Sequence, residues 1–442
     1  MNSHSQHIHI PVHVGTSDAH GTAVHLTADT RRRHLYVIGQ TGTGKSTLLL
    51  NMIAQGLAAG EGMAILDPLG GLAQAALAMV PAERAHELVY LDPTDLERPI
   101  GFNVLDHVPV DRRPTVADDI VSAFIHIWGD VAIGDRSQQV LRNCVRALLD
   151  APTATLLCIP KLLNNENYRA RILRTIRDPV VLTYWRDQFA TYKDDFRAQV
   201  TSPILNKLDA VLSAPAMRNI IGQPQSTINL RRIMDEERIL IVNLNQGNFG
   251  EVNAHLLGAF VVTRLAQAAF ARIDTPEADR RLFHLFADEF QDFASSGFNR
   301  ILSQARNFSL ALTLGHQYLG QLSDSLRDAT FGNAGNFIAC RVGAEDAPLI
   351  ARHLGLEPEL EYTGMGSREI APAQRLRQLK NFTAWTRFLI DDAPSEPMLI
   401  QLAATPKVIN HRPHRLITNS RVRFGRQRAD VEDRIRRFLE TP

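Results

Sequence analysis

One stretch of the chain, residues 39–47, reads Gly39-Gln40-Thr41-Gly42-Thr43-Gly44-Lys45-Ser46-Thr47. It follows the apolar run HLYVIG (34–39) and opens a helix-forming segment, so it has the order strand, glycine-rich loop, helix of a phosphate-binding loop (P-loop). Glycines let consecutive backbone N–H groups face one phosphate, and the helix N-terminus adds its positive end. The Lys45 ammonium would sit between the terminal phosphates, and the Ser46 hydroxyl is a hard oxygen ligand for Mg²⁺. The stretch therefore predicts binding of ATP and Mg²⁺ by residues 39–47.

A second stretch, residues 282–289, reads LFHLFADE and ends in two adjacent carboxylates, Asp288 and Glu289. Open α/β sheets place their ligands at the carboxyl ends of strands. Successive strand residues point to opposite sides, so Asp288 can face Mg²⁺ while Glu289 polarises the attacking water as a general base. A kinase with a small acceptor would have less use for such a glutamate. The pair therefore favours hydrolysis, the alternative being an ordinary surface Asp-Glu pair.

Gln317 follows a third apolar run, Leu310–Leu314. If that strand lies beside the strand that carries Asp288, Gln317 can sense the γ-phosphate or hold the water. The alternative is a plain loop amide.

Two arginines are candidates for a further role. Charge on the transferring phosphoryl group is often met by an arginine of a neighbouring subunit. Arg306 lies between the strand that precedes Asp288 and the strand that precedes Gln317. Arg341 lies near the end of a strand at 336–342. Arg306 is slightly favoured; the alternative for each is a surface salt bridge, for instance of Arg341 with Glu345 or Asp346.

Short apolar strands alternate with helices on both sides of a central helical block. This alternation predicts an α/β fold with a mostly parallel sheet and helices on both faces. Residues 109–236 show helical periodicity and almost no strand signal, which predicts an all-α insertion domain. The expected domains are an N-terminal leader or hairpin (1–31), a discontinuous P-loop domain (32–108 and 237–410), the insertion (109–236) and a basic C-terminal tail (411–442).

The net charge is +1, so binding to nucleic acid would need local basic patches. Residues 421–437 carry seven arginines against three acidic residues, and either a solvated amphipathic tail or a nucleic-acid contact fits them.

The three cysteines, Cys144, Cys158 and Cys340, form no CxxC pair, which favours a reducing cytoplasm and argues against a zinc ribbon.

The N-terminus lacks the features of a signal peptide, and no apolar run reaches the roughly 18 residues of a membrane span. The nearest approach, residues 255–270, is expected to be a buried helix. His4, His7, His9 and His13 fit a flexible leader or an edge strand better than a metal site, because no carboxylate or cysteine joins them.

Together these motifs resemble the FtsK–HerA superfamily of hexameric DNA-pumping ATPases, and within it the TraG-like coupling ATPases of conjugation and type IV secretion. The similar stretches run in the family's order from residue 32 to 347, among them RRHLYVIGQTGTGKSTLL (32–49) and FADEFQDFAS (286–295). The most specific is ARNFSLALTLGHQ (305–317), which ties Arg306 and Gln317 to one signature. The resemblance implies a RecA-like P-loop domain with an all-α insertion at the mouth of a hexamer, and ATP hydrolysis coupled to translocation of DNA without sequence preference.

The resemblance also implies a secretion, relaxase or effector protein as partner, and a place in the cytoplasm or at the inner membrane through that partner. Coupling proteins of this kind usually begin with transmembrane helices, whereas 38 residues precede the P-loop here. Charged residues that the family often carries are replaced by Leu69 and Gly71. Two other functions remain open: an assembly ATPase that acts on a protein without pumping DNA, and a slow nucleotide switch, against which Glu289 argues.

Overall fold

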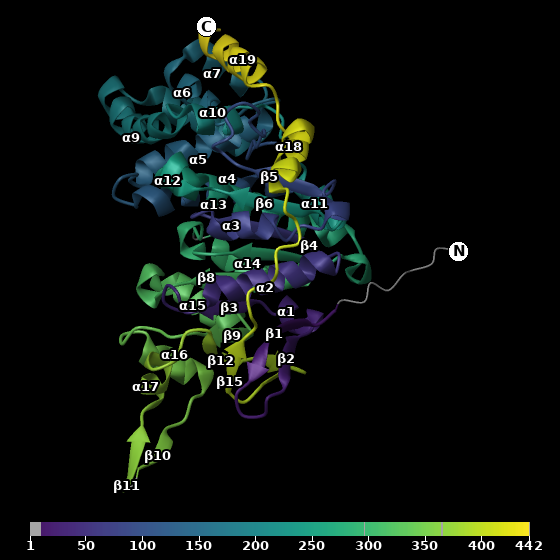
Figure 1. Ribbon diagram of the computed structural model, residues 1–442. Helices are drawn as coiled ribbons and strands as arrows, with labels where there is room; N and C mark the ends of the chain where they lie inside the picture. Colours follow the sequence, from purple (N-terminus) through teal and green to yellow (C-terminus); the bar gives the residue numbers. More distant parts are fainter. Residues whose placement is uncertain (1–9, 296, 364–365, 442) are drawn as a thin grey trace.

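The computed structural model describes residues 10–295, 297–363 and 366–441, and their main feature is one large sheet with the strand order β2-β1-β15-β12-β9-β3-β8-β7-β4-β6-β5 (Figure 1). All neighbours from β9 to β5 pair in parallel, and the remaining pairs are antiparallel. The predicted mostly parallel sheet is therefore confirmed. The strands are β1 (Val12–Ser17), β2 (Ala23–Leu26), β3 (Leu35–Ile38), β4 (Gly62–Asp67), β5 (Leu88–Leu91), β6 (Ile239–Asn243), β7 (Phe283–Ala287), β8 (Leu310–His316), β9 (Asn336–Ala339), β12 (Thr383–Arg387) and β15 (Met398–Leu402).

Helices cover both faces of this sheet, because alternate residues of its strands point to opposite sides. Leu35 and Val37 of β3 pack in a core with helices α2 and α3, whereas Tyr36 and Ile38 pack in the core of the other face with α13 and α14. The helices of the sheet region are α1 (Ala28–Arg32), α2 (Lys45–Ala58), α3 (Gly71–Leu77), α12 (Gln246–Phe249), α13 (Glu251–Phe270), α14 (Phe298–Gln304), α15 (Asp324–Asn333), α16 (Ala347–Leu354) and α17 (Pro372–Arg377).

Of the leader or hairpin expected in residues 1–31, the described part contains an antiparallel hairpin of β1 and β2, which lies at one side of the sheet. His4, His7 and His9 lie outside the described residues. His13 lies on β1, with its ring 5.2 Å from that of His25. Two further hairpins, β10 (Glu359–Thr363) with β11 (Gly366–Ile370) and β13 (Leu389–Ile390) with β14 (Ala393–Pro394), stand apart from the large sheet, and the first projects from the molecule (Figure 1).

Between β5 and β6 the chain forms only helices and no strand. We call residues 109–236 the helical unit. Phe124 on its first long helix lies 6.3 Å from Phe260 of α13, ring centre to ring centre, so the helical unit shares a continuous core with the sheet. Its α-helices are α4 (Arg113–Trp128), α5 (Asp135–Asp150), α6 (Cys158–Asn164), α7 (Glu166–Leu173), α8 (Pro179–Thr183), α9 (Asp194–Leu212), α10 (Pro215–Ile221) and α11 (Leu230–Asp235).

The apolar run at 255–270 is a core helix, as expected. Within the described part of the chain, one helical stretch, Glu251–Asp274, is long and apolar enough to cross a membrane, and 78% of its most apolar window is buried inside the fold. Its burial between α4 and the sheet accounts for that composition.

The C-terminal residues 403–441, here called the strap, cross the molecule from the sheet to the helical unit (Figure 1). The Asn51 side chain of α2 donates to the carbonyls of Ala403 and Ala404, and further along Tyr90 of β5 donates through its N–H to Ser420 Oγ at 2.7 Å. Its helices are α18 (Pro413–Phe424) and α19 (Arg428–Glu440). Helix α18 could not be predicted from the sequence, because only Leu416 and Ser420 of α18 are buried and its apolar periodicity is weak.

Candidate nucleotide site

The P-loop lies between β3 and α2, at the carboxyl edge of the parallel strands. Gly42 and Gly44 have φ of 78° and 118°, which glycine adopts without strain. A Cβ on Gly44 would also lie 2.8 Å from Leu402 Cδ1, so the Leu402 side chain would have to shift to admit one. The loop is tied to its neighbours, because Gly39 N–H donates to the His316 carbonyl and Gln40 N–H to the Arg341 carbonyl. The sequence thus forms a rigid glycine turn that leads into a helix N-terminus.

Lys45 brings the P-loop and the Asp-Glu stretch together. Its Nζ lies 2.6 Å from Glu289 Oε1 and 3.0 Å from Asp288 Oδ1. Ser46 Oγ donates to Asp288 Oδ2 at 3.3 Å. The side chains of Lys45, Asp288 and Glu289 keep only 6–10% of their surface exposed. Residues more than 240 positions apart in the sequence therefore converge in one buried ionic cluster, which we call the carboxyl-edge cluster.

Gln317 joins this cluster from the end of β8. Strand β8 pairs with β7, so the neighbouring position on which the role of Gln317 depended is confirmed. Its Nε2 donates to Glu289 Oε1 at 2.8 Å, and its Oε1 accepts from Thr41 Oγ1 of the P-loop at 3.1 Å. The amide thus bridges the carboxylate and the phosphate-binding loop, which is where a residue that positions water and reports on the terminal phosphate has to lie.

Two residues of the site were missed in the sequence. Gln291 Nε2 donates to Glu289 Oε2 at 3.1 Å, so both carboxylate oxygens are held. A Cβ on Gly315 would lie 2.8 Å from Asp288 Oδ1, so glycine in β8 makes room for that carboxylate. Glu289 itself has φ of 47°, a left-handed conformation that costs a non-glycine residue energy and that is frequent at functional sites.

The electrostatics of the cluster follow from one cation facing two carboxylates. Burial opposes the charge of Lys45, but Asp288 and Glu289 outweigh it and raise its pKa above the ordinary value. Burial raises the pKa of Asp288 in spite of Lys45. Burial also opposes ionisation of Glu289, but Lys45 and the amides of Gln317 and Gln291 outweigh it, so the pKa of Glu289 is lowered.

These residues fit a nucleotide with Mg²⁺. Ser46 and Asp288 supply the hard oxygen atoms that Mg²⁺ takes as ligands, and the second carboxylate leaves negative charge that one lysine does not neutralise. The P-loop backbone from Gly39 to Thr47 would face the phosphates, because α2 begins at Lys45 and its first N–H groups have no partner within the helix.

The two candidate arginines lie at opposite ends of the parallel strands. Arg341 follows β9 at the carboxyl edge, and its Nη1 donates to the Leu379 carbonyl at 3.2 Å. Arg306 is exposed and precedes β8, so it lies at the amino edge, away from the P-loop of its own chain. Of the two, only Arg341 shares an edge with the carboxyl-edge cluster.

The chain matches one protein family over most of its length. The family model described as the type IV secretion-system coupling protein DNA-binding domain matches residues 19–334. No curated protein matches the sequence.

Several solved structures have the same fold. The plasmid coupling protein TrwB in complex with the GTP analogue GDPNP aligns at a TM-score of 0.62 and 18% identity over 90% of this chain and 91% of that one. TrwB in complex with ADP and Mg²⁺ aligns at a TM-score of 0.58 and 18% identity over 88% of this chain and 90% of that one. VirB4 of Thermoanaerobacter pseudethanolicus aligns at a TM-score of 0.56 and 14% identity over 92% of this chain and 98% of that one. At these identities the similarity shows the fold.

Proposed function

The chain belongs to the family of type IV secretion-system coupling proteins with this DNA-binding domain, and we propose that it is an ATP-hydrolysing motor that moves DNA as a homo-oligomeric ring, a hexamer. The observation that carries the proposal is the convergence of Lys45, Asp288, Glu289 and Gln317 at one edge of the sheet. We place the motor in the cytoplasm, or at the inner membrane through a secretion, relaxase or effector partner.

Each residue of the cluster has one task in this proposal. Lys45 binds the terminal phosphates; its ammonium has three donors, so it can keep a carboxylate contact while it does so. Ser46 and Asp288 hold Mg²⁺, which would neutralise charge on the phosphates. Glu289, ionised at neutral pH because its pKa is lowered, accepts the proton of the attacking water, and Gln317 orients that water. TrwB has been solved with ADP and Mg²⁺ and with an ATP analogue, which supports ATP and Mg²⁺ as ligands here.

A ring would let one subunit control hydrolysis in the next. An arginine supplied in trans stabilises the charge that develops on the phosphoryl group. Arg306 and Arg341 remain the candidates. Because they lie at opposite ends of the parallel strands, each would face a different neighbouring subunit. Mass photometry with and without an ATP analogue tests assembly, and a chain that stays monomeric at micromolar concentration in both conditions would contradict the ring.

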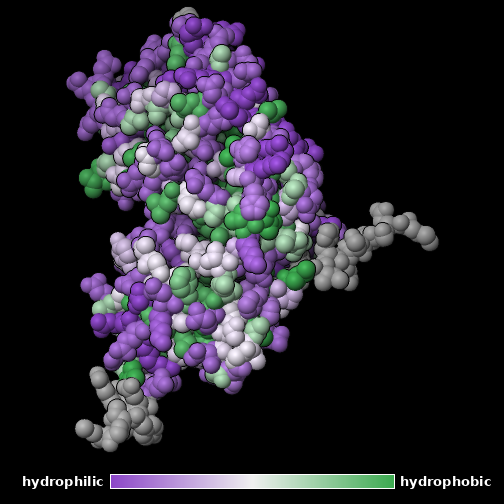
Figure 2. All heavy atoms as spheres, viewed as in Figure 1, coloured by the Kyte–Doolittle hydropathy of each residue, from purple (hydrophilic) through white to green (hydrophobic). Residues whose placement is uncertain are grey.

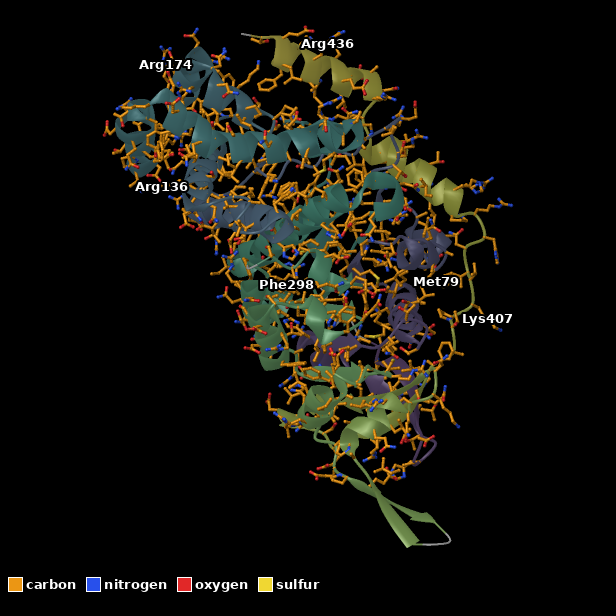
Figure 3. All side chains as sticks on the ribbon, turned by 90° about the vertical axis from the view of Figure 1, so that its left-hand side faces the viewer. Met79, Arg136, Arg174, Phe298, Lys407 and Arg436 are labelled. Atoms are coloured by element: carbon orange, nitrogen blue, oxygen red, sulfur yellow. The ribbon has the colours of Figure 1, made fainter. Side chains whose placement is uncertain are left out.

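Binding to DNA needs basic side chains that the fold leaves unneutralised, since the net charge is only +1. In the strap, Arg428 pairs with Glu432, and Arg436 and Arg437 both pair with Asp433. Figure 3 shows Arg436 and Arg174 pointing outward at the same end of the molecule, and Figure 2 shows mostly hydrophilic residues over the visible face at that end. We propose that phosphate contacts come from this end or from loops that line the ring.

Fluorescence anisotropy with single- and double-stranded DNA tests the DNA part of the proposal. Affinity should not depend on sequence and should fall steeply between about 50 and 200 mM salt, because phosphate contacts release counterions. Arg434→Gln is preferable to deletion of the strap as a test, because the strap packs on β5 and α10 and its deletion would disturb the fold. If neither DNA binds at low salt, the motor fails and an assembly ATPase that acts on a protein partner takes its place.

A further inference from the structure

Phe382 is an exposed aromatic residue in the turn before β12, beside the P-loop. The residue keeps 43% of its surface exposed. Its φ is 62°, a left-handed conformation in which a bulky residue is an outlier and which glycine or asparagine would adopt at less cost. The fold therefore holds a phenylalanine where local conformation and solvent exposure both disfavour it.

The backbone of Phe382 is held on two sides. Its N–H donates to the Thr43 carbonyl of the P-loop at 2.8 Å, and its carbonyl accepts from Leu402 N–H at 2.8 Å. The ring also lies close to the loop, because a Cβ added to Gly44 would lie 3.1 Å from Phe382 Cδ1. Arg341 holds the start of the same turn through the Leu379 carbonyl. The backbone of Phe382 is thus held beside the phosphate-binding loop, while 43% of the surface of the residue stays exposed.

The strand order places this ring on the side of the P-loop opposite the catalytic groups. In the order β12-β9-β3-β8-β7, the P-loop follows β3, Gln317 follows β8, and Asp288 and Glu289 follow β7. A triphosphate whose terminal phosphate faces these groups must extend its nucleoside the other way, over β9 and β12. The amino end of β12 reaches the same edge, because β12 runs antiparallel to β9, and Phe382 stands there.

We propose that the Phe382 ring is the surface on which the base of the bound nucleotide stacks, an inference that rests on the proposed function. A flat hydrocarbon ring offers a π-face and no hydrogen-bond donor or acceptor, so it binds any purine in the same way. The site would therefore hold ATP and GTP through the same contact, while the P-loop alone binds the phosphates.

Calorimetric titrations of the whole chain with Mg-ATP, Mg-GTP and inorganic tripolyphosphate test this inference. In Phe382→Ala the Kd of both nucleotides should rise by the same factor, about 5- to 150-fold, the range that stacking of one base supports. The Kd of tripolyphosphate, which has no base, should not change. Phe382→Trp should keep nucleotide affinity, and its added fluorescence should respond to ATP and not to tripolyphosphate. Phe196→Ala, an exposed phenylalanine of α9, is the matched control and should leave all three constants unchanged.

Three results would overturn the inference. Wild-type ATP affinity in Phe382→Ala would remove the phenyl group from the nucleotide site, and a defect in hexamer assembly beside it would reassign the group to a contact between subunits. Equal loss of ATP and tripolyphosphate would make Phe382 a residue that shapes the P-loop. A wild-type chain that binds neither ligand would end both this inference and the proposed function, whereas the first two results leave the proposed function intact.

Discussion

The two edges of the parallel sheet each bury an ionic cluster, and the two clusters are built differently. At the amino edge, Arg31 donates from both terminal nitrogens to the two oxygens of Glu61, at 2.7 and 2.6 Å, and His284 Nε2 lies 3.4 Å from Glu61. At the carboxyl edge, Lys45 is shared between Asp288 and Glu289. In both clusters the charged side chains keep no more than 10% of their surface exposed.

The difference lies in stoichiometry and in shape. A guanidinium fork that meets one carboxylate with two parallel hydrogen bonds is a charge-balanced pair of fixed geometry. A lysine is a flexible point charge; here it faces two carboxylates beside a glycine loop and a strained glutamate. An unbalanced cluster of this kind is suited to bind phosphate and a divalent cation, and the balanced one is suited to hold the fold together.

The largest expected effect separates two residues within the carboxyl-edge cluster. Glu289→Gln should keep ATP binding and lower turnover about 10²- to 10⁴-fold, because the general base is lost. Lys45→Ala should lose ATP binding itself, because its ammonium contacts phosphates in the ground state. Nucleotide titration and phosphate release on both variants check this. Turnover near wild type in Glu289→Gln would remove Glu289 from the role of base.

The next effect concerns the amino-edge cluster. Glu61→Ala leaves Arg31 buried without its bidentate partner and should lower the free energy of unfolding by about 3–5 kcal/mol. Urea unfolding measures this loss, and ATP affinity below the transition should stay at the wild-type value. A variant that unfolds normally but no longer binds ATP would break the contrast between the two edges.

A smaller effect is expected on the pH dependence of turnover. Gln317 donates to ionised Glu289 and thereby helps to keep the pKa of Glu289 below its ordinary value. In Gln317→Ala that pKa should rise, so the acidic limb of the pH–turnover profile should move to higher pH. Turnover at neutral pH should also fall, because the water is less well oriented. An acidic limb that stays in place or moves to lower pH would contradict the hydrogen bond as the cause.

The smallest effect is expected at the strap. Arg434→Gln should weaken DNA binding equally for all sequences and reduce the salt slope by about one phosphate contact, if this arginine touches DNA. Arg428→Gln is the control, because Arg428 is paired with Glu432. Equal effects of the two substitutions would show that fold disturbance and not phosphate contact is measured.

The sequence was informative where chemistry and strand signals coincide. The P-loop after an apolar run and Asp288-Glu289 after another predicted a parallel sheet and the meeting of Lys45, Asp288 and Glu289. The resemblance to coupling ATPases is confirmed by the family match. Phe382 could not be predicted, because it reaches the P-loop only through the pairing of β12 with β9 and β15. Nothing local marks Gln291 either, since its role depends on the turn at Glu289.

The central claim is that the carboxyl-edge cluster hydrolyses ATP and that DNA controls this hydrolysis. Steady-state phosphate release by the wild-type chain and by Glu289→Gln, each with and without DNA, tests it most directly. We predict release by the wild-type chain that increases with DNA, and release at least about 100-fold slower from Glu289→Gln in either condition, although this variant binds ATP. Release that DNA does not change, or release by Glu289→Gln near the wild-type rate, would contradict the claim.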